Sequence, residues 1–159
     1  MSTIANEKLA FDLLISILAT VILTTTIFSI STNNWNIQTE NFSVNRTGLF
    51  QQCTNTYCCE LKELDRSITI LSLFSIILLT ISTLSTFLLI SISINYKNRC
   101  YIIIPLTLFS SGIIMTLTLI QTLDRIYLNG YSAFIFIIDT ILVYILGGIA
   151  LLHANVFYF

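Results

Sequence analysis

Charged side chains are scarce in this sequence. Only 9% of the 159 residues are Asp, Glu, Lys or Arg, and 55% are hydrophobic, whereas roughly 25% charged residues is usual in soluble domains. So few charges cannot cover the surface of a soluble fold of this size, and we therefore expect lipid to act as the solvent for much of the chain. The formal net charge of −1 gives no indication of a nucleic-acid partner.

Proline, glycine and histidine are also rare. One Pro and five Gly leave no stretch that is typical of a flexible linker, and we expect one domain over residues 1–159. His153 is the single histidine, so a zinc site would lack ligands. No nucleophile with a base and no glycine-rich phosphate loop is present. We therefore expect no metal, no cofactor, no small-molecule substrate and no enzymatic activity.

Long apolar runs, by contrast, occur four times. A membrane-spanning helix needs about 20 mostly apolar residues, and uninterrupted runs of this length exclude the strands of a barrel. We predict spans at about 9–31, 67–94, 101–123 and 131–157. The connections are a long loop at 32–66 and tight turns at 95–100 and 124–130. Four spans place both ends of the chain on the same side of the membrane.

The long loop carries the features of a segment on the secretory side. Asn41 and Asn45 each begin an acceptor sequence for N-glycosylation, and three cysteines share the loop with them. Glycosylation and disulfide formation both belong to the lumen and the cell exterior, whereas the distribution of Lys and Arg is indecisive. We therefore expect loop 32–66 to be extracellular and both termini to be cytoplasmic.

Within this loop, Cys53 has two neighbouring candidates for a disulfide partner. Cys58 would close a loop of four residues and Cys59 a loop of five, and both lengths suit a hairpin. Adjacent residues of a strand point to opposite faces, so only one candidate can face Cys53. Loop length slightly favours Cys58. The remaining thiol is either buried or bridges to another chain.

A few isolated residues in or beside the spans are candidates for roles beyond packing. Asp139 lies well inside the fourth span, where a carboxylate is costly and often functional. The favoured interpretation is a hydrogen bond to Ser or Thr on a neighbouring helix, and the alternative is docking of another protein's helix. Asp12 is explained by an interfacial pair with Lys8. Cys100, in the predicted cytoplasmic turn, is either palmitoylated or an inert thiol.

The long loop also carries an ordered series of residues that resembles a known family. The series runs through Trp35, the tripeptide Gly48-Leu49-Phe50, Cys53 and finally Arg66 at the start of the second span. This order, with a large first loop and a small second one, resembles the claudin and peripheral myelin protein superfamily over the whole chain. Phe50 replaces the Trp of the usual family pattern. The glycine-bearing fourth span is also similar to the last helix of that group.

The resemblance implies a fold and a set of roles. The fold would be an all-α membrane protein, a left-handed bundle of four helices that carries a small antiparallel sheet made by the first loop. A disulfide would join the last two strands of the sheet. Trp35 would anchor the sheet at the lipid interface, and Gly48 would allow a tight backbone approach. Leu49 and Phe50 would pack onto the helix ends.

The resemblance also implies a function. A protein of this group is expected to be non-enzymatic, to lie in the plasma membrane and to organise cell–cell contacts, junctions or membrane architecture through its extracellular loop. The alternative, from the related channel gamma subunits, is an auxiliary subunit that modulates an ion channel or receptor. The expected partners are membrane lipids and other membrane proteins, met by self-association or as channel or receptor subunits.

Overall fold

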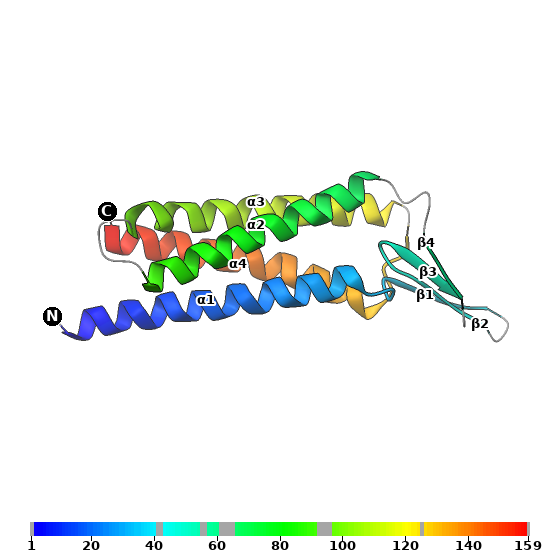
Figure 1. Cartoon of the computed structure of the whole chain (residues 1–159), viewed down its shortest axis with the longest axis horizontal. Helices are drawn as coiled ribbons and strands as arrows, with labels where there is room; N and C mark the ends of the chain where they lie inside the picture. The colour runs from blue at the N-terminus through cyan, green and yellow to red at the C-terminus, as the bar shows by residue number, and fades with distance from the viewer. Residues whose placement is uncertain are drawn as a thin grey trace.

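Four long helices run side by side, and a small sheet stands beyond one end of them (Figure 1). The computed structural model describes residues 2–40, 43–54, 57–60, 66–91, 97–124 and 126–158. The helices are α1 (Ser2–Ser31), α2 (Arg66–Ser91), α3 (Lys97–Leu123) and α4 (Tyr131–Tyr158). The predicted architecture of four helices and an antiparallel sheet is confirmed.

Each helix contains an apolar stretch long enough to cross a membrane. These stretches are Leu9–Ser31, Ser67–Leu88, Ile102–Leu123 and Tyr131–Ala154. The chain is therefore a multi-pass membrane protein whose apolar helix faces contact lipid.

The helices extend beyond the predicted spans at their polar ends. Helix α1 begins at Ser2, and α3 begins at Lys97. The predicted turn at 95–100 is therefore wrong from Lys97 onward, because a helix continues through polar residues as long as its backbone hydrogen bonds continue. The described part of α2 ends at Ser91, and the last residues of the predicted span 67–94 lie outside the described chain.

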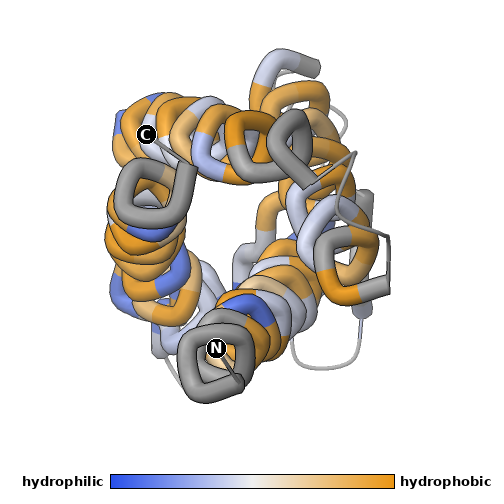
Figure 2. The backbone as a smooth tube through the Cα atoms, turned by 90° about the vertical axis from the view of Figure 1, so that its left-hand side faces the viewer, coloured by the Kyte–Doolittle hydropathy of each residue, from blue (hydrophilic) through white to orange (hydrophobic). Residues whose placement is uncertain are grey.

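The four helices are arranged as a closed ring. Each helix packs chiefly against its two neighbours in the order α1, α2, α3, α4 and back to α1, as the end-on view in Figure 2 shows. Both ends of the chain lie at the end of the bundle that is opposite the sheet (Figure 1). Helices α1 and α4 are therefore antiparallel neighbours, and this contact positions the polar residues discussed below.

The buried faces of the helices are rich in small hydroxyl side chains, while large apolar side chains point outward. In α2, Ser72 and Thr86 are buried, whereas Phe74 and Phe87 are exposed. The Ser72 hydroxyl donates to the carbonyl of Ile68, and most buried hydroxyls bond their own helix in this way. Small side chains let helices approach closely, which drives packing in lipid where apolar burial gives no advantage.

The sheet consists of four antiparallel strands in sequence order. They are β1 (Asn36–Glu40), β2 (Ser43–Thr47), β3 (Gln51–Thr54) and β4 (Tyr57–Glu60). Cys53 is disulfide-bonded. The register sets Cys53 directly opposite Cys58, and it sets Cys59 opposite Gln52. Paired residues share one face of a sheet, so the register favours Cys58 over Cys59 as the partner of Cys53.

Candidate functional site

Trp35 joins the end of α1 to the first strand and is completely buried. Its indole Nε1 donates to the backbone carbonyl of Ser29 at 2.8 Å, and its ring lies 5.2 Å from the ring of Phe136 in α4. Its backbone N–H donates to the carbonyl of Thr47 at the end of β2. Trp35 therefore anchors the sheet from inside the molecule and not from the lipid interface, because no part of the residue is exposed.

Two glycines allow main-chain segments to touch beside Trp35. A Cβ atom on Gly48 would lie 2.7 Å from Cα of Asn33, and one on Gly130 would lie 1.8 Å from the carbonyl oxygen of Asn34. The N–H of Gly130 donates to the carbonyl of Trp35 at 3.0 Å. The turn before α4 thus lies directly against the segment that leads into β1. Sequence reasoning singled out Gly48 but missed Gly130, whose signal is its place at the end of a short turn between two spans.

Asn129 attaches the same turn to the edge of the sheet. Its side-chain Oδ1 accepts from the N–H of Ile37 at 2.8 Å, and its Nδ2 donates to the carbonyl of Ile37 at 2.9 Å. A neighbouring antiparallel strand would make the same pair of bonds. The amide of Asn129 therefore satisfies the backbone of Ile37 on the outer edge of β1, which an unpaired strand would leave open.

Leu49 and Phe50 of the family-like series also lie near this junction. Leu49 is completely buried, and Phe50 is partly buried against the core. Arg66 is the first residue of α2, although its side chain lies outside the described part of the structure. Together with Trp35 and Gly48, Leu49 and Phe50 lie where the sheet meets the helix ends.

The candidate modification sites fall in different surroundings. Asn45 lies in the middle of β2, opposite Gln38 of β1 and Thr54 of β3. Asn41 lies outside the described residues. Cys100 belongs to the first turn of α3, and its side chain also lies outside the described part.

Asp139 of α4 is buried against α1 and has 3% of its surface exposed. Its Oδ1 accepts from the hydroxyl of Thr25 at 2.8 Å, and its Oδ2 accepts from the hydroxyl of Thr26 at 3.0 Å. The side chain therefore bonds within its own chain, which favours the first of the two interpretations. In this arrangement the carboxylate offers almost no surface to the helix of a second protein.

A second buried polar contact joins α1 and α4 near the chain ends. The Nε2 atom of His153 lies 3.1 Å from Oδ1 of Asp12, and each side chain has only 3% of its surface exposed. The ring of Phe11 stacks on the imidazole at 5.3 Å, with an interplanar angle of 10°. The proposed pairing of Asp12 with Lys8 missed this contact, and the side chain of Lys8 lies outside the described part of the structure.

These contacts are suited to holding elements together. Within the described residues, no group of three His, Cys, Asp or Glu side chains could bind a metal ion. Asp12 and His153 are closed off from solvent, so a substrate in solution has no access to them. The sheet junction and the α1–α4 interface therefore fix the position of the sheet relative to the membrane.

The sheet, its junction and the buried α1–α4 contacts are thus the features from which a function must be argued. No protein-family model matches the sequence, and no curated protein matches it.

Proposed function

We propose that this protein is a non-enzymatic membrane protein of the claudin and peripheral myelin group that organises contacts between cells, junctions or membrane architecture. The observation that carries the proposal is the attachment of the sheet: Trp35, Asn129 and Gly130 hold it at a fixed position beyond the helix ends. A surface held in this way can meet a partner without a large loss of conformational entropy.

In this proposal the sheet faces the cell exterior, both termini are cytoplasmic, and the protein lies in the plasma membrane. The sequons at Asn41 and Asn45 and the disulfide-bonded Cys53 support this orientation. The glycosylation of Asn45 is part of the same proposal.

The far edge of the sheet supplies a suitable contact residue. Tyr57, the first residue of β4, is 79% exposed, and Gln51, Gln52 and Thr54 of the neighbouring strand are also exposed. Exposed tyrosines are common anchors of protein–protein interfaces because they bury a large area at a small cost in side-chain entropy. We therefore place the contact surface on β3 and β4.

The auxiliary-subunit alternative came from the resemblance to channel gamma subunits, and its candidate docking point in the fourth span was Asp139. Its hydrogen bonds to Thr25 and Thr26 use that carboxylate within the chain. The contact role is for this reason the leading proposal, and capture of a channel or receptor is an outcome of the test below.

The test is contact enrichment in mixed cultures of cells that do not otherwise form junctions. Labelled protein should accumulate where two expressing cells touch and not where an expressing cell touches a non-expressing one. Tyr57→Ala should reduce this enrichment by about half or more, because an anchor tyrosine carries a large share of an interface's energy. Tyr127→Ala is the matched control, since Tyr127 is 81% exposed but belongs to the turn between α3 and α4.

Two results would contradict the proposal. One is equal distribution of the protein over contacting and free membrane, with no particle array in freeze-fracture images. The other is an equal loss of enrichment in both tyrosine variants, which would move the contact away from β3 and β4. Affinity capture that recovers a channel or receptor in place of a second copy would favour the auxiliary role.

A further inference from the structure

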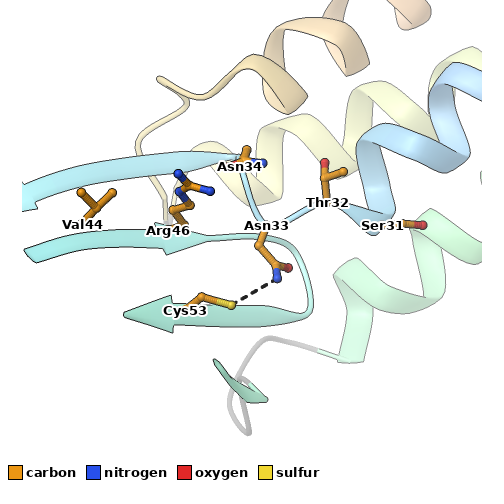
Figure 3. Close-up of a pocket in the computed structure, with 7 residues that line it drawn as sticks. All are labelled: Ser31, Thr32, Asn33, Asn34, Val44, Arg46 and Cys53. Carbon is orange, nitrogen blue, oxygen red and sulfur yellow. Dashed lines mark hydrogen bonds between the residues drawn. The ribbon is translucent and has the colours of Figure 1, made fainter. Parts of the chain in front are cut away.

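A polar pocket of about 560 Å³ lies where α1 meets the sheet (Figure 3). The described part of its lining consists of hydroxyl and amide side chains, one valine, a disulfide-bonded cysteine and one cation. The lining residues are Ser31, Thr32, Asn33, Asn34, Val44, Arg46 and Cys53. Among the lining residues that the structure describes there is no carboxylate, so this part of the lining carries the positive charge of Arg46.

The cation of the pocket is Arg46, an exposed residue of β2. Its guanidinium forms no hydrogen bond or ion pair with any residue that the structure describes. The other polar groups are already engaged: Nδ2 of Asn33 donates to Gln51 and to the sulfur of Cys53. Arg46 therefore supplies the free charged donors, of which a guanidinium has five, while the other side chains shape the wall.

The strand pattern keeps this pocket clear of a glycan. Val44 and Arg46 are two residues apart in β2 and share one face, and Arg46 lies opposite Cys53 in β3. Asn45, between them, points to the other face, where it is paired with Gln38 and Thr54. A sugar attached to Asn45 would therefore leave the sheet on the side away from Arg46.

The position of the pocket relative to the membrane indicates its ligand. The apolar stretch of α1 ends at Ser31, which is also the first lining residue. The pocket thus begins at the level where the hydrocarbon core gives way to lipid headgroups. Directly below Ser31 on the same side of α1, Ile27 and Phe28 are 42% and 53% exposed and can support an acyl chain.

We propose that this pocket binds the phosphodiester group of a membrane phospholipid. The guanidinium of Arg46 holds the phosphate oxygens by paired charge-assisted hydrogen bonds, for which its fork geometry is well matched. The acyl chains lie along Ile27 and Phe28. A free phosphate ester shares the headgroup chemistry but lacks the contact with α1. This difference distinguishes a phospholipid from a soluble phosphate ester as the ligand. The inference does not depend on the role in cell contact.

The test uses the full-length protein in detergent, titrated with phosphatidylglycerol and followed by native mass spectrometry. Phosphatidylglycerol is chosen because its phosphodiester is its single charged group. Arg46→Gln should weaken binding about tenfold, since a charge-assisted bond of this kind is worth about that factor. The affinity of Arg46→Lys should lie between those of the native protein and Arg46→Gln, because lysine keeps the charge but lacks the forked geometry of the guanidinium. Arg46 is exposed, so the melting temperature without lipid should stay unchanged.

A charge-matched control separates the pocket from general attraction. The double substitution Arg46→Gln with Gln38→Arg keeps the net charge and moves the cation to the opposite face of the sheet, because Gln38 pairs with Asn45. Binding should remain weak in this variant. Restored binding in the double variant, or equal binding by the native protein and Arg46→Gln, would overturn the site. Equally tight binding of glycerol phosphate would overturn the lipid as its ligand.

Discussion

The interface between α1 and α4 is held in different ways at its two ends. At the sheet end, the carbonyls of Asn34 and Trp35 accept from backbone N–H groups at the start of α4, and Gly130 lies in close contact with them. At the other end, side chains make the contact: Asp12 pairs with His153, and Phe11 stacks on the imidazole. The first end is fixed by main-chain geometry, and the second by the chemistry of two ionisable groups.

This difference determines what each end tolerates. A main-chain contact without space for a Cβ atom accepts only glycine, whatever the side chains around it. A side-chain pair can be replaced by another pair of similar volume, but not one member at a time. A single added methyl group should therefore destabilise the sheet end. At the opposite end, replacement of only one member of the Asp12–His153 pair should destabilise the protein.

The largest expected effect is that of Gly130→Ala. The added Cβ atom would lie 1.8 Å from the carbonyl oxygen of Asn34, so the backbone must shift and the hydrogen bond to Trp35 must break. We expect a loss of about 4 kcal/mol or more, which few single substitutions reach. The measurement is the melting temperature of the detergent-solubilised protein, together with the monodisperse fraction in size-exclusion chromatography.

The matched control for this change is Gly148→Ala in α4. A Cβ atom at Gly148 meets nothing within 4 Å, and alanine has the higher helix propensity by about 1 kcal/mol. This variant should be as stable as the native protein or more so. Equal melting temperatures for Gly130→Ala and the native protein would show that main-chain proximity does not fix the sheet end.

The sequence was sufficient for the helices because apolar length alone determines which segments span a membrane. The sequence could not show that Gly130 lies against Asn34 and Trp35, because such a contact depends on which loops are neighbours in the tertiary structure. The family resemblance also led us to expect Trp35 at the lipid interface. Burial of Trp35 depends instead on the sheet that covers it.

The spacing of the polar residues along α1 and α4 relates the two polar contacts between these helices. Thirteen residues separate Asp12 from Thr25, and fourteen separate Asp139 from His153. In antiparallel helices with equal rise per residue, one contact therefore fixes the other. The expectation that Asp139 faces a Thr or Ser on a neighbouring helix named no residue, and only the identification of Thr25 of α1 as that residue places His153 beside Asp12.

A smaller effect is expected from removal of one member of the Asp12–His153 pair. Asp12→Leu leaves the imidazole buried without this partner and should cost about 2 kcal/mol, between the values typical of buried ion pairs in soluble proteins and of polar contacts in membranes. His153→Leu should behave similarly. Thermal unfolding in detergent at constant pH measures both.

The double variant Asp12→Leu with His153→Leu is the decisive control. It removes both polar groups and should be more stable than either single variant, because neither member of the pair is left buried without the other. Additive losses in the double variant would mean that the two side chains act independently and that their pairing does not hold the α1–α4 interface at the end opposite the sheet.

The smallest effect should come from Asp139, although it lies deepest in the bundle. Thr25 also donates to the carbonyl of Val21 at 2.9 Å, so Asp139→Leu leaves this hydroxyl with an acceptor, whereas the buried hydroxyl of Thr26 loses its bond to Oδ2 of Asp139. Removing the carboxylate also removes the cost of burying it in lipid. We expect a change in stability below about 1 kcal/mol, in line with typical polar contacts between membrane helices.

A loss as large as that of Asp12→Leu would show that Asp139 fixes the interface as strongly as the Asp12–His153 pair. Loss of a co-purifying membrane protein at unchanged melting temperature would instead identify Asp139 as a docking residue.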